Sequence, residues 1–314
     1  MTTVLLLLGL LGGFFWLRSV FNRIDRVEVS PVLSSGGAGT NYLIVGSDSR
    51  DVLAENDAAF DPAAPSDSQR SDTMMVLHFG GDGAKIMSIP RDLYVPIADG
   101  SGDGKINAAY NGGPQTLIQT ISESLGIPIE RYMEVDFVSF AGLVDGLGGV
   151  TIDFPHPAMD RESGLLVTQS GPVELNGEQA LAYARSRQYT ECVNGTYGRL
   201  EPPGFAECIG GEEVADPTGD LGRIQRQQAF LTVVFGKLGD TRNPVALARS
   251  LSNASAGLRI DDTMSMWDAV RLGWSLRGLD PAPVELPVDA GSNEAGFVFF
   301  LDEAAAQPVL DQFR

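Results

Sequence analysis

The chain has 314 residues, 43% of them hydrophobic and 20% charged, a composition typical of a folded protein with a substantial core. Acidic residues outnumber basic ones by 41 to 22, and the formal net charge at pH 7 is -19. Because nucleic-acid phosphates are bound by basic surfaces, this charge argues against a nucleic-acid partner. Any phosphate-bearing ligand must instead be met by a local group of basic side chains.

The N-terminus is an apolar segment. From Val4 to Trp16 it contains only apolar residues and Gly, and the run continues past Arg18 to Phe21. A membrane-spanning helix needs about 20 apolar residues. We expect residues 1–21 to be a single-pass anchor in the cell membrane, with the rest of the chain outside the cytoplasm. There are two alternatives, a cleaved signal peptide and a buried core helix. A signal peptide typically has a basic start and an Ala-x-Ala cleavage site.

The folded domain is expected to cover residues 41–314. Residues 22–40 end in SSGGAGT and are predicted to be a linker. The domain then opens with a buried strand from Tyr42 to Val45, and a Gly-Ser-Asp turn places Asp48 at the strand end. Residues 51–69, rich in Asp, Ala, Pro and Ser, are predicted to form a loop.

A β-hairpin follows this loop. Two apolar stretches, 73–79 and 84–90, are joined by Gly-Gly-Asp-Gly, a strong hairpin signal. The second stretch leads directly into Arg91 and Asp92. Pro114 to Leu125 is predicted to be a helix, with Pro in its first turn and an apolar face.

The remaining elements alternate irregularly between strand and helix. We predict strands at 132–137, 149–154 and 296–301, helices at 140–147, 176–187, 220–238, 244–251 and 264–276, and a terminal helix. This order, with a hairpin inside it, predicts an α/β fold: a three-layer α-β-α sandwich whose mixed central sheet is covered by helices on both faces.

Arginines gather at the ends of two of these helices. Arg185 and Arg187 are two residues apart, so they share a direction only if their helix ends between them. Arg223, Arg226 and Gln227 occupy positions i, i+3 and i+4 of the next helix and therefore share a face. Forked guanidinium groups suit phosphate oxygens, which predicts a phosphate-binding site.

Two cysteines, Cys192 and Cys208, lie in a Gly-, Pro- and Glu-rich stretch at 188–219 that we interpret as a surface loop. A disulfide between them would indicate an oxidising compartment; two unpaired thiols are the alternative. The histidines, His78 and His156, are distant in sequence, which argues against a metal site at the cysteines.

Several common chemistries lack their motifs. The sequence has no G-x-S-x-G nucleophile turn, no G-x-x-x-x-G-K-[ST] loop and no G-x-G-x-x-G that opens a helix. Carboxylates and guanidinium groups remain, which fits phosphoryl transfer. Asp48 and Asp72 are candidates to share a hard cation such as Mg²⁺.

Seven motifs, in this order, resemble the LytR-CpsA-Psr family of cell-wall assembly proteins between Asn41 and Leu238: IVGSDSR, RSDTMMV, MSIPRDLYVPI, KINAAYNGG, VDFVSFAGLVDGLGGVTID, LNGEQALAYARSR and DLGRIQRQQAFL. The resemblance implies a membrane protein that transfers a glycopolymer from a polyprenyl-pyrophosphate carrier to peptidoglycan. It implies a phosphodiester product and assistance by Mg²⁺. Teichoic acid, capsule and arabinogalactan are possible polymers, and the Lys-poor composition leans toward arabinogalactan.

The same resemblance assigns roles to residues. It implies that Asp48 and Asp72 hold the metal and that Arg91, Asp92 and Asp48 are the catalytic group. The pyrophosphate would be bound by Arg91, Lys105, Arg185, Arg187, Arg223 and Gln227, with Arg226 added by its spacing. Asp92 and Asp220 would orient the arginines. An apolar tunnel for the lipid would be lined by Phe137, Phe140, Leu143, Val144, Leu147, Phe230, Leu231 and Val234, unless these form ordinary core.

Two other functions use parts of this pattern. A polyprenyl-pyrophosphate hydrolase would need the same arginines and would admit water in place of the sugar. A non-catalytic lipid-binding protein would keep the tunnel but would not need both Asp48 and Asp72. A transcription factor is hard to reconcile with the negative charge.

Overall fold

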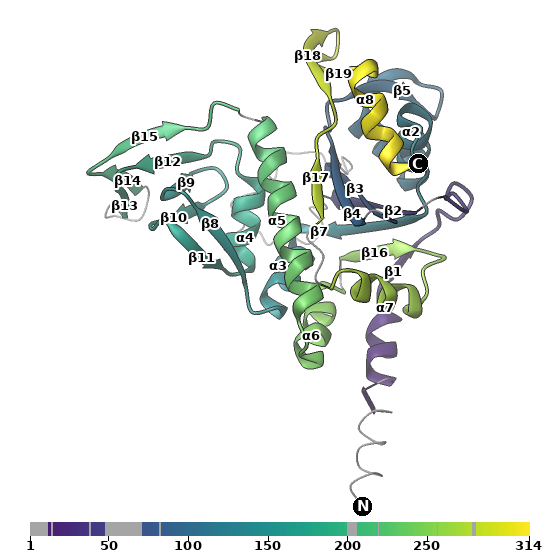
Figure 1. Cartoon of the computed structure of the whole chain (residues 1–314), viewed down its shortest axis with the longest axis horizontal. Helices are drawn as coiled ribbons and strands as arrows, with labels where there is room; N and C mark the ends of the chain where they lie inside the picture. Colours follow the sequence, from purple (N-terminus) through teal and green to yellow (C-terminus); the bar gives the residue numbers. More distant parts are fainter. Residues whose placement is uncertain are drawn as a thin grey trace, which may run out of the picture.

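The computed structural model describes residues 12–13, 15–37, 39–47, 71–81, 83–199, 206–218, 220–255, 257–277 and 281–314. Residues 15–21 are helical and lead into the body of the molecule (Figure 1). In these ranges no helix combines the length and the apolar character that a membrane crossing requires. Most of the predicted anchor lies outside the described residues.

A seven-stranded mixed sheet forms the centre, in the order β1-β16-β7-β2-β3-β4-β17. Its strands are β1 (Asp25–Val27), β2 (Thr40–Ser47), β3 (Ser71–Gly80), β4 (Gly83–Ile89), β7 (Arg131–Asp136), β16 (Leu258–Asp261) and β17 (Ala282–Val284). β2, β3 and β4 are antiparallel neighbours, whereas β2 pairs with β7 in parallel. The predicted hairpin is formed by β3 and β4, which lie inside the sheet between β2 and β17.

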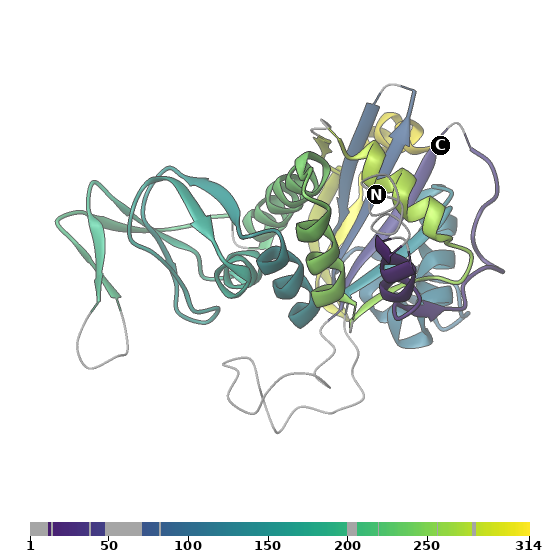
Figure 2. The same ribbon diagram turned by 90° about the horizontal axis from the view of Figure 1, so that it is seen from below.

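Helices cover both faces of this sheet (Figures 1 and 2). On β3, Met74 and Val76 pack into a core with α2 (Pro114–Leu125) and α8 (Glu303–Leu310). The alternate residues Met75 and Leu77 pack into a second core beneath α5 (Asp220–Asp240) and α7 (Met266–Ser275). Because successive side chains of a strand point to opposite faces, one buried strand serves both cores. The predicted three-layer α/β architecture is confirmed.

Three further helices join this body. They are α3 (Phe137–Gly146), α4 (Gly177–Arg185) and α6 (Pro244–Ala254). A Cβ atom on Gly146 would collide with the backbone of Ser250, so this glycine lets α3 and α6 approach closely. Asn176 caps α4 in a capping box with Gln179, and Ser186 ends the helix. The helix therefore does end between Arg185 and Arg187.

A group of strands projects from one side of the body, and we call it the strand lobe (Figure 2). It comprises β8 (Val150–Phe154), β9 (Ala158–Asp160), β10 (Leu165–Val167), β11 (Gly171–Leu175), β12 (Thr190–Val193), β13 (Thr196–Arg199), β14 (Ala206–Ile209) and β15 (Glu212–Ala215). β12 pairs with β9 and with β15, and Cys192 forms a disulfide with Cys208 across a Cα–Cα distance of 5.4 Å.

The structure differs from the sequence interpretation at three places. Residues 188–219, interpreted as a loop, contain β12, β13, β14 and β15 in their described part. The predicted linker contains β1, which pairs with β16 in the central sheet. Other short strands were also missed: β5 (Tyr94–Ile97), β6 (Gly102–Lys105), β9, β10, β11, β16, β17 and β18 (Val288–Asn293). β19 (Gly296–Leu301), which pairs with β18, was predicted.

Candidate functional site

Four neighbouring strands, β7, β2, β3 and β4, begin or end at the same end of the central sheet, which we call the sheet edge. Ser47, at the end of β2, pairs with Ser71 of β3 on one side and with Asp136 of β7 on the other. β4 ends at Ile89, which pairs with Met74 three residues further along β3. Open α/β sheets place their sites at such an edge, where loops leave the strands.

The two predicted metal ligands follow residues of this edge. Asp48 comes directly after Ser47 and lies outside the described residues. Asp72 comes directly after Ser71; its backbone belongs to β3, and its side chain lies outside the described set. Among the side chains that are described, no cluster of three or more His, Cys, Asp or Glu residues has a metal-binding arrangement. The register brings the residues that precede both aspartates together.

Arg91, Asp92 and Lys105 form one charged group where the chain leaves β4. Lys105 Nζ lies 2.8 Å from Asp92 Oδ1, and Arg91 Nε lies 3.4 Å from Asp92 Oδ2. The backbone holds Asp92 in place, because its carbonyl accepts a hydrogen bond of 2.9 Å from the Phe299 amide. All three side chains keep some exposure, so two partly exposed cations share one carboxylate.

A second basic group forms where α4 ends against the start of α5. Arg226 forms an ion pair with Asp216 and donates a hydrogen bond of 3.1 Å to the Ser186 carbonyl. Its guanidinium also lies 4.5 Å from the centre of the Tyr189 ring. Gln227 donates from Nε2 to the Ala184 carbonyl at 3.0 Å. These contacts fix the exit of α4, which carries Arg185 and Arg187, on the first turns of α5.

The arginines of this second group differ in exposure. Arg223 is 3% exposed, Arg185 is half-buried and Arg187 is exposed. The side chain of Asp220, predicted to orient Arg223, is not among the described ones. Asp216, four residues before Asp220, is a described acid that contacts an α5 arginine, Arg226.

A hydrogen bond ties the start of α5 to the edge of the sheet beside Arg91. Gln225 Nε2 donates to Glu285 Oε1 at 3.2 Å. Glu285 follows β17, whose last residue Val284 pairs with Met87 of β4. The turn of α5 that carries Arg223 and Arg226 is thereby held next to the end of β4, so both basic groups belong to one region of the molecule.

Asp160 is buried, and the sequence did not reveal it. Its carboxylate accepts hydrogen bonds from the Ser186 hydroxyl at 2.6 Å, the Gln188 amide at 2.9 Å and the Glu162 amide at 2.8 Å. Burial alone would raise the pKa of Asp160, but these hydrogen bonds outweigh burial and hold that pKa below its usual value of 3.8. A charged Asp160 therefore fixes the residues on both sides of Arg187.

Asp216 had a local signal in the sequence. Asp-x-Thr is a common turn pattern, and the Thr218 amide donates to Asp216 Oδ1 at 2.8 Å. Burial opposes ionisation, yet the hydrogen bonds from Thr218 and Arg226 lower the pKa of Asp216. Gly222 makes the arrangement possible, because a Cβ atom there would collide with the Asp216 carboxylate and the Thr218 hydroxyl.

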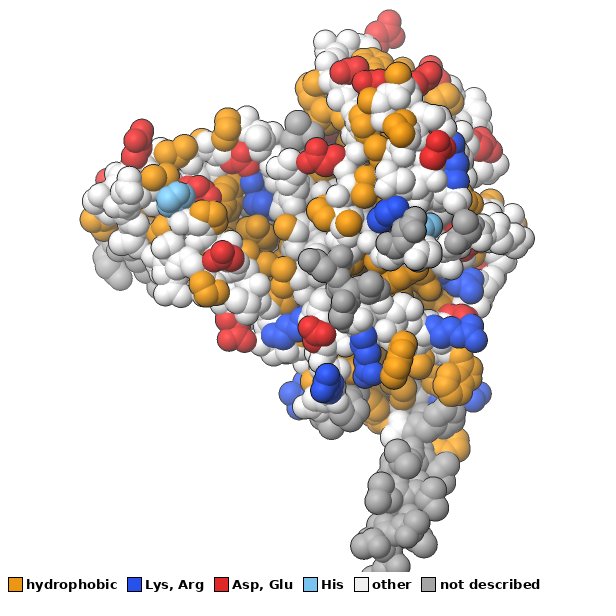
Figure 3. Space-filling view, viewed as in Figure 1, with side chains coloured by type: hydrophobic (Ala, Val, Ile, Leu, Met, Phe, Trp, Pro, Cys, Tyr) orange, Lys and Arg blue, Asp and Glu red, His pale blue; other side chains and the backbone are white. Residues whose placement is uncertain are grey.

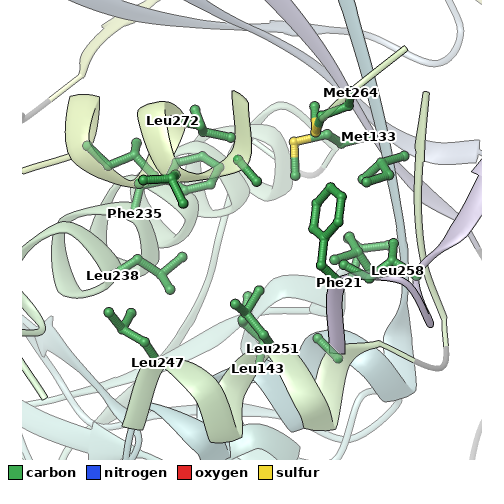
Figure 4. Close-up of a pocket in the computed structure, with 18 of the residues that line it drawn as sticks. Phe21, Met133, Leu143, Phe235, Leu238, Leu247, Leu251, Leu258, Met264 and Leu272 are labelled. Carbon is green, nitrogen blue, oxygen red and sulfur yellow. The ribbon is translucent and has the colours of Figure 1, made fainter. Parts of the chain in front are cut away.

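An apolar cavity of about 430 Å³ lies under the face of the sheet that α5 and α7 cover. Figure 4 shows side chains that point into it from α3, α5, α6, α7, β7 and β16, and Phe21 from the N-terminal helical segment. Four of the predicted tunnel residues line it: Phe140, Leu143, Leu231 and Val234. Val144, Leu147 and Phe230 instead pack in the core beside the strand lobe, and the side chain of Phe137 is not described.

Helix α5 connects the basic groups with this cavity. Its first turns carry Arg223, Arg226 and Gln227, and one turn after Gln227 the cavity wall begins at Leu231. Val234, Phe235 and Leu238 continue the wall. The basic residues and the residues that line the cavity therefore share about 22 Å of one helix. The site thus offers cations at one end and an apolar chamber at the other.

Comparison with known proteins agrees with these features. The sequence model of the LytR_cpsA_psr family matches residues 22–202. The chain belongs to the LytR-CpsA-Psr family. It is 32% identical over 308 residues to LcpB of Corynebacterium glutamicum, a probable cell wall biosynthesis protein. The matched region covers 95% of this chain and 66% of that protein. It is 29% identical over 219 residues to TagV of Bacillus subtilis, covering 66% of this chain and 49% of that protein.

The fold is shared with solved structures of the family. A LytR-Csp2A-Psr enzyme from Actinomyces oris superposes with a TM-score of 0.69 at 22% identity, covering 93% of this chain and 96% of that one. TagT bound to LI-WTA superposes with a TM-score of 0.64 at 23% identity, covering 92% and 96%. At this level of identity the likeness establishes the fold. The family resemblance inferred from the motifs is confirmed.

Proposed function

We propose that this protein is a phosphotransferase that moves a glycopolymer from a polyprenyl-pyrophosphate carrier to a sugar hydroxyl of peptidoglycan. The observation that carries the proposal is the design of α5, which places an arginine group one turn from an apolar cavity wall. A polyprenyl pyrophosphate has the matching construction, an anionic group joined to an apolar tail. TagV supports the transfer reaction, because it is named a polyisoprenyl-teichoic acid–peptidoglycan teichoic acid transferase.

In this proposal the residues of both basic groups bind the pyrophosphate: Arg91, Lys105, Arg185, Arg187, Arg223, Arg226 and Gln227. Their charges balance the negative charge that the phosphate oxygens carry in the transition state. Asp92, which contacts both Arg91 and Lys105, orients these two cations. Asp216 does the same for Arg226.

The reaction forms one bond and breaks one. The acceptor hydroxyl oxygen attacks the phosphorus that bears the glycan, and the bond between this phosphorus and the bridging oxygen breaks. Polyprenyl phosphate leaves with the electron pair. The hydroxyl proton passes to a carboxylate of the sheet edge, for which Asp48 and Asp92 are the candidates.

The donor set at this edge suits Mg²⁺, because carboxylate oxygens are the protein ligands that this ion prefers. Asp48 and Asp72 are proposed to hold it, since the residues before them are paired across β2 and β3. A bound Mg²⁺ would neutralise part of the phosphate charge.

We also propose that the protein is anchored in the cell membrane by residues 1–21, with its folded domain outside the cytoplasm. The apolar composition of this segment supports the anchor. The Cys192–Cys208 disulfide supports the compartment, because such bonds persist under oxidising conditions.

The test follows label from a polyprenyl-pyrophosphate-linked saccharide into peptidoglycan fragments, with the full chain and Mg²⁺. Arg91→Ala is expected to slow transfer by about 100-fold, because it removes a cation that contacts the reacting phosphates. Arg242→Ala, at an exposed position after α5, is the control and should transfer normally. Equal rates in both variants would contradict the proposed site. Label released as free sugar phosphate would indicate a hydrolase, and bound but unchanged lipid would indicate a carrier.

A further inference from the structure

Helix α7 is unusual because it has no buried residue, although much of it is apolar. Trp267 is 62% exposed and Trp274 is 68% exposed, with Val270 between them at 42%. Their spacing of three and four residues places all three on one side of the helix. Exposed tryptophans of this size are costly in water, so a row of them indicates a surface that is covered in the working protein.

The N-terminal helical segment lies beside α7. Figures 1 and 2 both show the segment 15–21 leaving the body next to this helix. Phe21 and Ile24 pack in the same core as Leu272 of α7, and Arg26 donates to the Met264 carbonyl at 2.5 Å. The segment also carries Trp16, which is 46% exposed. All three tryptophans of the chain therefore lie at one end of the molecule.

Arginines surround these tryptophans in an otherwise acidic protein. The side chain of Arg271 is 81% exposed, and the guanidinium of Arg277 lies 4.3 Å from the centre of a Trp274 ring. Arg18 and Arg23 on the N-terminal segment are exposed as well. Figure 3 shows basic and hydrophobic side chains side by side in the lower part of the molecule. Asp268 is the acid of α7, and it is engaged by Arg131 at 3.8 Å and by Arg271 at 3.8 Å.

We propose that this surface, Trp16, Trp267, Val270, Arg271, Trp274 and Arg277, is a membrane-docking face that rests on the headgroup region of an anionic bilayer. Tryptophan is enriched at that depth because its ring is apolar and its N–H is polar, and arginine attracts anionic headgroups. Trp16 belongs to the apolar run that begins at Val4, so the segment proposed as the membrane anchor joins the described part of the chain at this face. A protein partner would not explain why tryptophans, arginines and the apolar segment coincide.

The inference rests on the proposed membrane attachment and deepens the proposed function, because it states how the lipid substrate arrives. Val270, Trp274 and Arg277 belong both to the docking face and to the wall of the cavity. A docked α7 would place this part of the cavity wall against the bilayer. The polyprenyl tail would then pass from membrane to cavity without crossing water, which its apolar length makes costly.

The test uses the chain's own tryptophans as reporters. The full chain is reconstituted into phosphatidylcholine and phosphatidylglycerol vesicles that contain phosphatidylcholine brominated at a shallow or a deep acyl position. Trp16→Phe with Trp274→Phe leaves Trp267, which does not line the cavity. Shallow bromines are expected to quench about half of the Trp267 emission, and deep bromines less. Trp267→Phe with Trp274→Phe leaves Trp16 and reports insertion of the anchor.

Three outcomes would overturn the docking face. The first is unquenched Trp267 when Trp16 is quenched. The second uses the variant in which Trp274 is the single tryptophan. Quenching of Trp274 there, while Trp267 stays unquenched in its own variant, would place lipid in the cavity only. The third is a blue-shifted but unquenched Trp267, which would indicate that protein covers the face.

A second measurement separates this inference from the proposed function. Trp267→Ser with Arg271→Glu is expected to lower transfer from a vesicle-embedded donor by about ten-fold and to leave transfer from a water-soluble short-prenyl donor unchanged. Phe297→Ser, an exposed aromatic at the opposite end of the molecule, is the matched control. Equal rates with the two donors would contradict the docking face. If the unmodified chain transfers from neither donor, the proposed function fails, and the quenching experiment still decides the docking face.

Discussion

The central body and the strand lobe are stabilised in different ways. In the body, β2, β3 and β4 are buried on both faces between helices, and their side chains belong to two large cores. The outer part of the lobe has a small cluster made of Met159, Cys192, Tyr197 and Ala206, with a disulfide beside it. Hydrophobic burial therefore stabilises the body and the inner strands of the lobe, such as β8 with Phe154. The outer strands of the lobe have the small cluster, the disulfide and buried hydrogen bonds instead. The candidate site has residues from both regions, because Arg91 follows β4 of the body and Arg187 precedes β12 of the lobe.

The largest expected effect comes from the body. Leu43→Ala removes a side chain that is 0% exposed at the middle of β2 and should lower the free energy of unfolding by about 4 kcal/mol. Ile209→Ala in the lobe, where the side chain is 56% exposed, should change it by less than about 0.5 kcal/mol. Urea denaturation measures both. Similar losses in the two variants would show that the regions do not differ in this way.

A smaller effect is expected from the disulfide. Cys192→Ser with Cys208→Ser opens a loop of 16 residues, and chain entropy predicts a loss of about 3 kcal/mol confined to the lobe. Hydrogen exchange should therefore lose protection in β12 to β15, while β2 and β3 stay protected. Loss of protection in the central strands would mean that lobe and body unfold together.

The smallest expected effect is electrostatic and depends on pH. The folded-state pKa of Asp160 is lowered below 3.8, so its contribution is complete above that value and is lost as the pH falls through the folded pKa. The exit of α4 should loosen in acid before the body does. Asp160→Asn should remove this pH dependence. It should lower the free energy of unfolding by about 1 kcal/mol at pH 7, because the hydrogen bonds then go to a neutral amide in place of a charged carboxylate. Exchange of the Gln188 amide as a function of pH is the measurement; an unchanged profile in the variant would contradict it.

Much of the body could be predicted from local sequence. α2 has the predicted bounds, α5 begins at the predicted Asp220, and the hairpin of β3 and β4 is where Gly-Gly-Asp-Gly indicated. Long apolar or periodic runs carry this information because both faces of each strand and one face of each helix must be buried. The strands of the lobe are three to five residues long and partly polar, so their pattern resembles that of loops.

The candidate site divides in the same way. Its arginines were found because guanidinium groups at the ends of predicted elements are chemically informative on their own. Asp160 was missed because it acts through Ser186 and Gln188, which are 26 and 28 residues away in sequence. Asp216 was missed although the Asp-x-Thr turn was visible, and the role of Asp220 stays a prediction.

The sequence by itself determined the family, the long helices and long apolar strands of the body, and the residue types that suit a phosphate. Only the tertiary structure decided which residues work together: that Asp216 and Tyr189 hold Arg226, that one helix joins cations to an apolar cavity, and that three tryptophans share one end of the molecule. The physical reason is that local periodicity and turn chemistry act between near neighbours. Contacts between segments depend on how the chain packs as a whole.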